Sequence, residues 1–511
     1  MEHLVKIKTA VLSVSDKSGL KELAQVLTDH HVELYSTGGT EKFLSENGFA
    51  VKNISDLTNF PEMMDGRVKT LHPSVHGGLL YRRDDAVHVV QATEHKIKAI
   101  DLLVVNLYPF EATVAKRDST HEDIVENIDI GGPAMLRSAG KNYESVSLLT
   151  SPSQYPEFIQ DLTEHHGATT SAMRLRLAAE GFEHVAIYDR AISNYFLGYT
   201  GAGLRYGENP HQNALVSGTM LRDLYHQLWG KELSFNNYLD ASASLEIISE
   251  FLDSTTTVVG IIKHTNPCGI AEGATVLDAF ERAFNTDTES PFGGIIVMNK
   301  PLTLELATRL NEFFSEVILA PEYESEALEL LKKKKDRRLL TYSPEKLKSA
   351  MSSEKQSRSV LGGSLTQDRD NALFATDDLT SVTTRQPSES ELNGLFFAWK
   401  ICKHVKSNAI VYARVDDGYA HTIGIGGGQT SRVASSRIAV ANAKRFGHHL
   451  EQSLVASDAF FPFADGLLEA ADAGAVAIIQ PGGSIRDPEV IAAAEERGVS
   501  LVMTGMRHFK H

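Results

Sequence analysis

The sequence contains very little cysteine, with only Cys268 and Cys402 in 511 residues. Neither has a second ligand at the spacing of a metal site, so a disulfide-rich scaffold and a cysteine-rich zinc module are both excluded. Such a composition is typical of a reducing compartment. We therefore expect a cytoplasmic protein with no metal site.

Positive charge is also in deficit. The chain has 50 Lys and Arg residues against 66 Asp and Glu residues, a formal net charge of −16 at pH 7. A strongly acidic protein is repelled by nucleic acids and by anionic membranes, although local sites can still bind small anions. We expect no nucleic-acid or membrane partner, and we interpret the basic run at residues 332–338 as a solvated helix face.

Long hydrophobic runs are absent as well. No apolar stretch approaches the ~18 residues of a membrane span, and lysine, serine and aspartate interrupt any signal-peptide core in MEHLVKIKTAVLSVSDKSG. Hydrophobic residues make up 42% of the chain and charged residues 23%, which is typical of a globular protein. Because 511 residues are too many for one core, we expect a soluble protein of about two to four domains.

Strands and helices alternate in the first part of the chain. Residues 7–14 predict a strand followed by a helix from about Leu20, and HVELYS predicts a second strand that leads through STGGT into a helix. Further strands are predicted within residues 101–110 and 144–152. This order predicts a parallel, doubly wound α/β sheet, whose ligands bind beyond the carboxyl ends of the strands.

A second α/β region begins near residue 200. Residues 154–198 are rich in helix formers and predict a helical connector, after which strands are predicted within residues 255–269, 291–299 and 316–323. NGLFFAWKICKHVKSNAIVYA predicts a helix that leads into another strand. We predict domains at 1–198 and 199–511, the second made of subdomains at about 199–385 and 386–511.

The STGGT loop combines Ser36, Thr37, Gly38, Gly39 and Thr40. Glycines let backbone N–H groups approach a phosphate, and a helix N-terminus adds a favourable dipole. A tight strand-to-helix turn explains the same residues equally well. Neither G-x-G-x-x-G nor the Walker pattern is present, so a nucleoside triphosphate is not indicated.

Ionisable side chains gather in DGRVKTLHPSVHGG, which carries Arg67, Lys69, Thr70, His72 and His76. Loops with this density of charged and hydroxyl groups favour an anionic-substrate site over a structural role. NLYPF and DIGGPAMLRSAGKN add Tyr108, Asp129 and Lys141, which we expect at loop or helix-start positions. Tyrosine and lysine transfer protons near neutral pH only where the environment tunes their pKa.

In IIKHTNPCG, Lys263 and His264 leave an apolar strand just before a turn that contains Pro267. A cation beside a base whose pKa lies near the working pH favours a catalytic pair over a structural one at the end of a strand. Cys268 is not followed by a second cysteine in the P-C-x-x-C pattern, so zinc-deaminase chemistry is not predicted.

An ordered series of motifs resembles one family over essentially the whole chain. The series comprises SVSDKSGL, STGGT, DGRVKTLHP, HGG, NLYPF, IDIGGPAMLRSAGKN, LRYGENPHQ, KHTNPCG, WKICKHVKSNAIV, GGGQTSRV and TGMRHF. It resembles the bifunctional aminoimidazole carboxamide ribonucleotide (AICAR) formyltransferase/inosine monophosphate (IMP) cyclohydrolase family of purine biosynthesis. The resemblance implies a methylglyoxal-synthase-like cyclohydrolase domain, followed by a transformylase region of two cytidine-deaminase-like subdomains.

The resemblance also implies chemistry and partners. A formyl group passes from the co-substrate 10-formyltetrahydrofolate to the 5-amino group of AICAR, and the formyl-AICAR product closes to IMP with loss of water. No metal or redox cofactor is implied. A homodimer with transformylase sites at the subunit interface is implied.

The resemblance assigns roles in the transformylase region. His264 would be the general base, Lys263 its partner in stabilising charge, and Asn408 the group that orients the formyl carbon. The substrate-binding positions would be Arg205, Tyr206, Phe292, Gly293, Arg432, Arg507 and Phe509.

It assigns further roles in the cyclohydrolase domain. Ser13, Ser15, Lys17, Ser36, Thr37 and Gly39 would surround the phosphate, and Arg67, Lys69 and Thr70 would close over the ring substituents. Lys69, Tyr108, Asp129 and Lys141 would move protons during cyclisation.

Ser74 and Thr430 depart from the family's usual residues, without removing a catalytic group. Two other functions are compatible with the sequence: a purine-nucleotide sensor without turnover, and an enzyme with one inactive domain. The paired proton-transfer groups argue against the sensor, because a binding protein does not need them.

Overall fold

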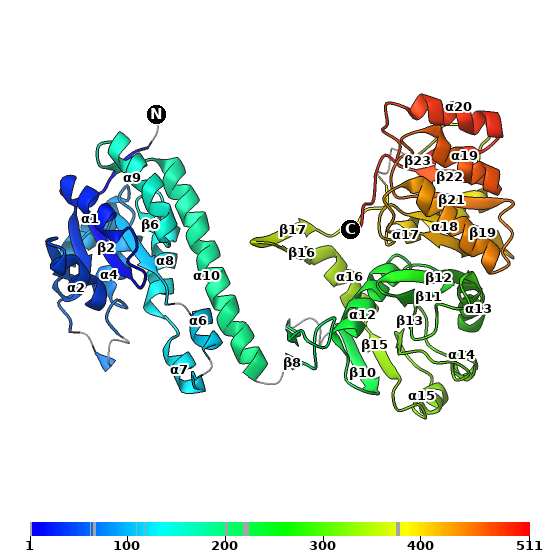
Figure 1. The fold of residues 1–511 in the computed structure, drawn as a ribbon, viewed down its shortest axis with the longest axis horizontal. Helices are drawn as coiled ribbons and strands as arrows, with labels where there is room; N and C mark the ends of the chain where they lie inside the picture. The colour runs from blue at the N-terminus through cyan, green and yellow to red at the C-terminus, as the bar shows by residue number, and fades with distance from the viewer. Residues whose placement is uncertain are drawn as a thin grey trace. The chain divides into compact units, whose positions relative to one another are not determined.

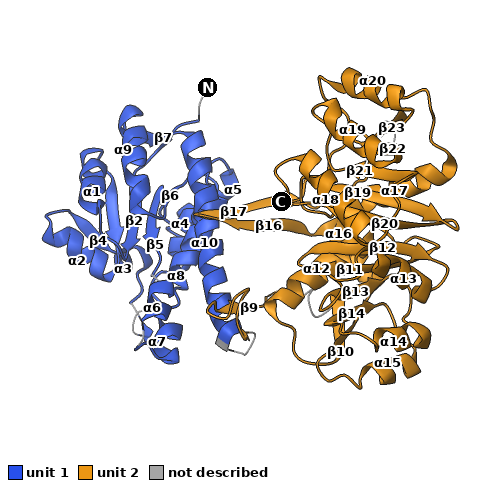
Figure 2. Cartoon of the chain, turned by 45° about the vertical axis from the view of Figure 1, so that its right-hand side comes forward, with its two compact units in different colours: residues 1–202 blue, residues 203–511 orange. Residues whose placement is uncertain are grey.

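The computed structural model describes residues 3–61, 63–64, 68–108, 110–116, 118–199, 203–217, 224–374 and 379–511. The chain divides into two compact units, unit 1 over residues 1–202 and unit 2 over residues 203–511 (Figure 2). Among the helices formed by the described residues, none is both long and apolar enough to cross a membrane.

Unit 1 is built on a five-stranded sheet in which every neighbouring pair is parallel, in the order β4-β3-β2-β5-β6. Its strands are β2 (Thr9–Val14), β3 (Glu33–Ser36), β4 (Val51–Asn53), β5 (Leu102–Asn106) and β6 (Ser147–Leu149). Side chains that alternate along β2 enter different cores, Val11 on one face and Leu12 on the other. The predicted doubly wound parallel sheet is therefore confirmed.

Helices cover both faces of this sheet (Figure 1). One core includes residues of α1 (Leu20–Asp29) and α9 (Tyr155–Glu164), and the other includes residues of α4 (Pro73–Leu80), α8 (Gly131–Lys141) and α10 (Ser171–Tyr199). The described residues of unit 1 also form α2 (Gly38–Glu46), α3 (Ile54–Thr58), α5 (Ala86–Glu94), α6 (Phe110–Ala115), α7 (His121–Glu126) and the 3₁₀ helix η2 (Pro152–Gln154). Because α2 begins at Gly38, the predicted glycine loop is the first turn of a helix.

The predicted connector belongs largely to the fold of unit 1. Residues 154–198 contain α9, the short strand β7 (Ala168–Thr169) and most of α10, and β7 pairs with β1 (Val5–Lys6). Leu177, Ala178 and Val185 of α10 are buried in the cores of unit 1. The helix formers of this segment belong mostly to α10, which is one long helix that packs against α8 and β6.

Unit 2 contains one twelve-stranded sheet in the order β10-β15-β14-β13-β11-β12-β20-β19-β21-β22-β23-β18. The first-half strands are β10 (Tyr225–Trp229), β11 (Thr257–Lys263), β12 (Asn266–Gly273), β13 (Ile295–Met298), β14 (Val317–Ala320) and β15 (Arg338–Tyr342). The second-half strands are β18 (Thr380–Ser381), β19 (Ile410–Asp416), β20 (Tyr419–Gly426), β21 (Ser453–Ser457), β22 (Ala475–Gln480) and β23 (Ser500–Met503).

The two halves of this sheet repeat one order of elements: helix, hairpin, helix, strand, helix, strand, helix, strand. The first-half helices are α12 (Phe235–Ser249), α13 (Val276–Thr286), α14 (Leu304–Leu310) and α15 (Ser325–Leu331), and the second-half helices are α17 (Glu389–Cys402), α18 (Arg432–Arg445), α19 (Ala464–Ala473) and α20 (Asp487–Arg497). The halves, here called the first and second lobes, join where β12 pairs antiparallel with β20, Ala271 opposite His421. The predicted fold class, with two similar lobes in the larger region, is confirmed.

Three smaller features lie outside the large sheet among the described residues of unit 2. The hairpin of β8 (Gly203–Leu204) and β9 (Ala214–Leu215) precedes the first lobe. Helix α16 (Pro344–Ser353) leads into a hairpin of β16 (Lys355–Val360) and β17 (Gly363–Asp368), which stands away from the large sheet in Figure 1.

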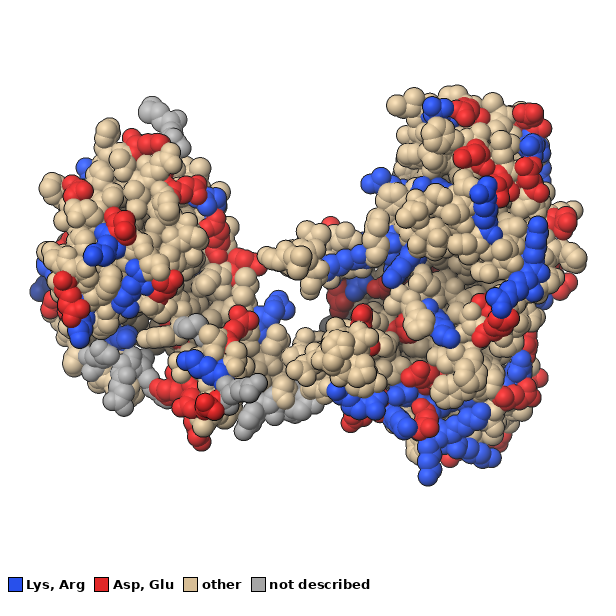
Figure 3. Space-filling view, in the orientation of Figure 1, with Lys and Arg blue, Asp and Glu red and all other residues tan. Residues whose placement is uncertain are grey.

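The basic run at residues 332–338 is not the solvated helix face that we expected. Helix α15 ends at Leu331, and the run forms the turn into β15. Lys334 Nζ donates to the Asn311 carbonyl at 2.6 Å, and Arg337 Nη2 donates to the Leu310 carbonyl at 2.8 Å. The two side chains thus satisfy carbonyls at the end of α14. Other Lys and Arg side chains gather on the surface around α15 (Figure 3).

Candidate active sites

In unit 1, the carboxyl ends of β3, β2 and β5 lie side by side and present hydroxyl groups. Ser13 Oγ lies 3.0 Å from Thr37 Oγ1, and Thr37 is the N-cap residue of α2. Ser36 is fully buried, and its hydroxyl donates to the Leu12 carbonyl at 2.7 Å. Gly39 lies in the first turn of α2, so its backbone N–H belongs to the N-terminal group that attracts an anion.

Asn106, the last residue of β5, organises the loop after β2. Its Oδ1 accepts hydrogen bonds from Ser15 N at 2.6 Å, Ser15 Oγ at 2.9 Å and Asp16 N at 2.9 Å. Lys17 Nζ, in the same loop, lies 3.5 Å from the Ser15 carbonyl. Sequence reasoning missed Asn106, although Asn106 is the first residue of the NLYPF motif that contains Tyr108.

Thr70 and Asp129 meet at the N-terminus of α8. A Cβ at Gly131 would lie 2.5 Å from Thr70 Oγ1, so glycine permits this close approach. Asp129 Oδ1 accepts the Gly132 N–H at 2.8 Å. Burial raises the pKa of Asp129, while hydrogen bonds from backbone N–H groups and the charge of Lys69 oppose that rise.

Tyr108 follows β5 and is 51% exposed. Lys141 is the last residue of α8 and is exposed, so the expectation of a loop or helix-start position is wrong. Eleven helical residues rise about 15 Å, which separates Lys141 from the end of α8 that carries Asp129. Arg67 lies outside the described residues.

In unit 2, the turn between β11 and β12 carries the predicted catalytic pair. Lys263 ends β11, and His264 and Thr265 form a two-residue turn with φ values of 52° and 63°. Asp240 of α12 braces this turn, because its Oδ1 accepts the Thr265 N–H at 2.7 Å. Burial raises the pKa of Asp240, against the turn's hydrogen bonds. Sequence reasoning missed Asp240, which is 25 residues from Thr265 and lies in no conspicuous motif.

The segment that leads into β13 lies along one side of this turn. Lys263 Nζ donates to the Phe292 carbonyl at 3.0 Å and to the Ser290 carbonyl at 3.3 Å. The Phe292 side chain is 64% exposed, and Gly293 has a φ of 77°, which suits glycine. An aromatic face therefore stands exposed beside the predicted catalytic pair.

The second lobe supplies a second polar group. Asn408 donates from its backbone N and its Nδ2 to the Gln429 carbonyl, at 3.1 and 2.9 Å. Arg432 Nη2 lies 3.1 Å from Oδ1 of Asp458, which is fully buried. The guanidinium groups of Arg432 and Arg507 lie 5.8 and 4.7 Å from the centre of the Phe509 ring. The structure thus brings together residues from three separate motifs.

A cavity of about 280 Å³ lies between the two lobes, with Lys263 of the predicted catalytic pair in its wall. Its walls include Lys263, Asn266, Cys268, Asp287 and Ser290 from the first lobe and Val405, Lys406, Gly427, Gly428 and Asn442 from the second. Asn266 Oδ1 accepts the Lys406 N–H at 3.2 Å and so links the lobes beside the cavity. Burial raises the pKa of Cys268 to about 12, which keeps this thiol protonated.

Arg205 and Tyr206 lie in the segment between β8 and β9, and the Arg205 guanidinium is 5.6 Å from the Tyr206 ring centre. Burial, and then repulsion from Arg205, lowers the pKa of Arg338. Arg338 Nη1 pairs with Glu316 Oε1 at 3.3 Å, and Asn237 Nδ2 donates to the same oxygen at 3.1 Å. Arg205 therefore stands near the charged groups beside α12.

Two family models match the chain. The AICARFT/IMPCHase bienzyme model matches residues 139–442, and the MGS-like domain model matches residues 19–134. The second match covers most of the parallel sheet of unit 1, in agreement with the methylglyoxal-synthase-like fold expected there.

Curated relatives match from end to end. The bifunctional purine biosynthesis protein PurH of Pelodictyon phaeoclathratiforme is 52% identical, and that of Chlorobium phaeobacteroides strain BS1 is 51% identical, each over 99% of both chains. The PurH of Ruegeria sp. strain TM1040 is 49% identical over 100% of both. The crystal structure of ForH, with 35% identity and a TM-score of 0.34, matches 37% of this chain and 99% of its own.

The two family models and the relatives together cover both units. The chain belongs to the AICARFT/IMPCHase bienzyme family, whose members combine an AICAR formyltransferase with an IMP cyclohydrolase.

Proposed function

We propose that the enzyme divides the last two steps of de novo purine synthesis between its units. The cyclohydrolase would occupy residues 1–198 and the transformylase residues 199–511, with subdomains at 199–385 and 386–511. One observation carries this division: each unit brings together polar side chains from separate segments of the chain, at the ends of β2, β3 and β5 in unit 1 and around the cavity between the lobes in unit 2. The family's two activities need one such group of side chains each.

In unit 2, the 5-amino group of AICAR attacks the formyl carbon of 10-formyltetrahydrofolate. This amine is a poor nucleophile because its lone pair is conjugated with the imidazole ring, so His264 accepts its proton as the C–N bond forms. Lys263 stabilises the negative charge on the formyl oxygen and protonates N10 of the folate as the old C–N bond breaks. The products are formyl-AICAR and tetrahydrofolate.

Other residues of unit 2 hold the reactants. Asn408 orients the formyl group, and the exposed Phe292 ring with Gly293 lies beside the base of the nucleotide. Arg205, Tyr206, Arg432, Arg507 and Phe509 hold the rest of the nucleotide. The two guanidinium groups beside the Phe509 ring support this role, since Arg507 offers a positive charge to a phosphate while Arg432 is held in place by Asp458.

In unit 1, the carboxamide nitrogen of formyl-AICAR attacks the formyl carbon of the same molecule, and water leaves. Ser13, Ser15, Lys17, Ser36, Thr37 and Gly39 form the phosphate site. Arg67 and Thr70 close over the ring substituents. Asp129, Lys69 and Tyr108 move the protons, and positioning an intramolecular reaction contributes about 7 kcal/mol or more. Lys141 stays a predicted participant, although it ends α8 far from Asp129.

The assembly and surroundings follow the family. We propose 10-formyltetrahydrofolate as the co-substrate and no metal. We propose no redox cofactor either, because formyl transfer and dehydration change no oxidation state. We also propose a cytoplasmic homodimer with the transformylase sites at the subunit interface, and no nucleic-acid or membrane partner.

The test is to mix the purified enzyme with AICAR and 10-formyltetrahydrofolate and to follow tetrahydrofolate and IMP. We expect both products. Accumulation of formyl-AICAR without IMP would show that unit 1 is inactive. Tight substrate binding without either product would favour the purine-nucleotide sensor. His264→Ala should abolish formyl transfer and spare cyclisation of supplied formyl-AICAR. Loss of both activities in a folded variant would contradict the division.

A further inference from the structure

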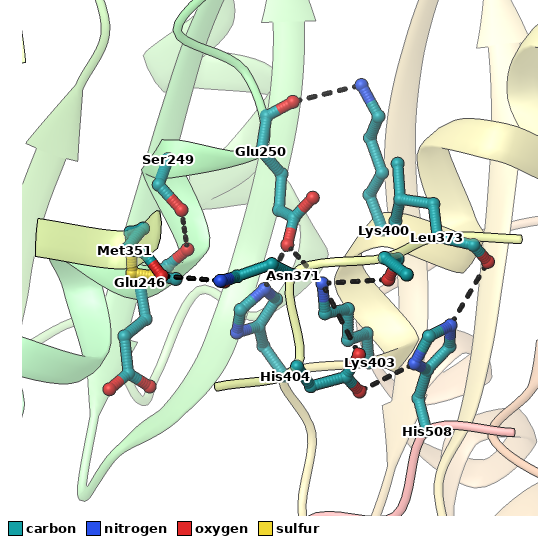
Figure 4. A network of polar contacts seen from close by, with 12 residues as sticks. Glu246, Ser249, Glu250, Met351, Asn371, Leu373, Lys400, Lys403, His404 and His508 are labelled. Atoms are coloured by element: carbon teal, nitrogen blue, oxygen red, sulfur yellow. Dashed lines mark hydrogen bonds and ion pairs between the residues drawn. The ribbon is translucent and has the colours of Figure 1, made fainter. Parts of the chain in front are cut away.

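A buried polar network joins the two lobes of unit 2 outside the catalytic groups (Figure 4). Its centre is Glu250, whose Oε1 lies 2.9 Å from Lys403 Nζ and 3.0 Å from His404 Nε2. The exposed fractions of the three side chains are 10%, 3% and 6%. A carboxylate, an ammonium group and an imidazole are thus removed from water together.

Glu250 and Lys403 occupy equivalent places in the two lobes. Glu250 is the C-cap residue of α12, and Lys403 is the C-cap residue of α17, the matching helix of the second lobe. Each stands seven residues before the first strand of its lobe's hairpin, β11 at Thr257 and β19 at Ile410. The ion pair therefore ties together the two helix ends from which the hairpins of the sheet begin.

The charges in this network are matched. Burial alone would raise the pKa of Glu250, but the hydrogen bond from His404 and the charge of Lys403 lower it to about 2. Burial lowers the pKa of His404, so the imidazole is neutral and donates its Nε2–H to the carboxylate. A buried ion pair adds little stability over an apolar contact, whereas loss of one partner leaves an uncompensated buried charge. Its use here is to fix a geometry.

The network extends to the C-terminal segment. Lys403 Nζ also donates to the Ala372 carbonyl at 3.2 Å, and His508 Nδ1 lies 2.6 Å from Asp370 Oδ2. Lys510 Nζ pairs at 3.2 Å with Glu246, one helical turn before Glu250. The segment that carries Arg507 and Phe509 is therefore anchored on the C-terminal end of α12, the same helix end that binds Lys403.

The chain leads directly from this network into the cavity. Val405 and Lys406, which follow His404, line the same cavity as Lys263, and Asn408 comes two residues later. The Lys406 N–H reaches Asn266 in the first lobe at 3.2 Å, and the Ser407 N–H reaches the Lys510 carbonyl at 2.8 Å. A shift of the end of α17 would move Asn408 relative to Lys263.

We propose that Glu250 is a positioning residue for formyl transfer: through Lys403 and His404 it holds residues 405–408 of the second lobe in register with Lys263 and His264 of the first. This inference rests on the proposed formyltransferase site of unit 2. Glu250 itself touches no reactant. It acts through the placement of Asn408.

The test compares charge-removing and charge-keeping variants of the full-length enzyme. Glu250→Gln and Lys403→Met should each lower the kcat of formyl transfer tenfold or more, with the KM for AICAR changed less than twofold. Lys403→Arg keeps the charge and should retain kcat within threefold. Because the two partners act as one unit, the double variant should be no slower than the slower single variant.

Matched controls separate positioning from stability. Glu391→Gln breaks a partly buried pair with Arg385 at the other end of α17, 2.5 Å between Arg385 Nη2 and Glu391 Oε1, and should leave kcat unchanged. Cyclisation of supplied formyl-AICAR in the same samples should stay at the wild-type rate. If Glu250→Gln unfolds unit 2, the comparison of Lys403→Met with Lys403→Arg decides.

Wild-type kcat in folded Glu250→Gln or Lys403→Met would overturn the inference, as would an equal loss in Glu391→Gln. A wild-type enzyme without formyl transfer would instead overturn the proposed function. The two failures are therefore distinguishable.

Discussion

The two units assemble their sites in different ways. In unit 1, Ser13, Thr37 and Asn106 stand at or just beyond the ends of β2, β3 and β5, which are neighbouring strands of a single parallel sheet. In unit 2, Lys263 and Asn408 come from separate lobes, and contacts such as Asn266 with Lys406 link them. In a parallel sheet, the topology alone brings the loops after the strands to one edge. A site shared by two lobes depends instead on the contacts that hold the lobes together.

The strongest test of this comparison is a crossed pair of substitutions. Asp129→Asn should slow cyclisation 10²- to 10⁴-fold and spare formyl transfer, the reverse of His264→Ala, since each variant removes one proton-transfer group. Separate assays with AICAR and with supplied formyl-AICAR measure both rates. Should Asp129→Asn slow both reactions equally in a folded enzyme, the sites would not be independent.

Low pH should lower the free energy of unfolding of unit 2, because Glu250 becomes protonated. A carboxylate whose pKa is lowered from 4.5 to about 2 stabilises the folded state above the unfolded pKa, and that stability is lost as the pH falls toward the folded pKa. The loss is on the order of 3 kcal/mol between pH 5 and pH 2. Calorimetry of wild type and Glu250→Gln at stepped pH should show a steeper decline for wild type. Parallel declines would contradict the role of this carboxylate.

The pH dependence of cyclisation sharpens the comparison from the side of unit 1. Burial raises the pKa of Asp129, so its carboxylate takes up a proton at higher pH than an exposed aspartate does. We expect kcat/KM for formyl-AICAR to fall on the acid side around that raised pKa. In Asp129→Asn the residual rate should lack this acidic limb, and an unchanged profile there would assign the limb to another group.

A smaller effect is expected at Asn106. Asn106→Ala removes the oxygen that accepts the Ser15 and Asp16 N–H groups and so loosens one side of the phosphate site. We expect the KM for formyl-AICAR to rise about tenfold, or about 1.4 kcal/mol, with formyl transfer unchanged. Steady-state kinetics on both substrates measure this. A change in formyl transfer alone would count against the loop's assignment.

The smallest effect is expected at the basic run. Lys334→Ala removes one donor to the carbonyls at the end of α14, which should cost about 0.5–1 kcal/mol of stability in unit 2. Thermal unfolding measures it, and both activities should stay at wild-type rates. A loss of formyl transfer in the folded variant would show that this basic run contributes to catalysis or substrate binding.

The parallel sheet of unit 1 was predictable because its signals are local. Alternation along β2 divides Val11 from Leu12 between two cores, and the hydroxyl-bearing loops directly follow the strands. The buried strand β15 was missed in a polar stretch, because Arg338 stands at its start. That arginine is tolerated at 5% exposure because its guanidinium binds the Glu232 carbonyl and Glu316.

Lys141 shows how local reasoning fails at the other extreme. Its motif follows the Asp129 loop closely, which suggested a shared site. One helix separates them, since each residue of α8 adds about 1.5 Å along its axis. Closeness in sequence is closeness in space within a loop, but not along a helix.

The sequence by itself determined the α/β character and predicted that the proposed phosphate-loop residues and the proposed catalytic pair stand at strand ends, because these features depend on periodicity and on neighbouring residues. The tertiary structure alone decided that Glu250 meets His404 across 154 residues, and that Asp240 braces the His264 turn. The Glu250–His404 contact follows from the pairing of β12 with β20 and from the packing of two helix ends, and the Asp240 contact follows from the packing of α12 against β11. No local pattern encodes them, since each partner's neighbours along the chain are compatible with many other pairings.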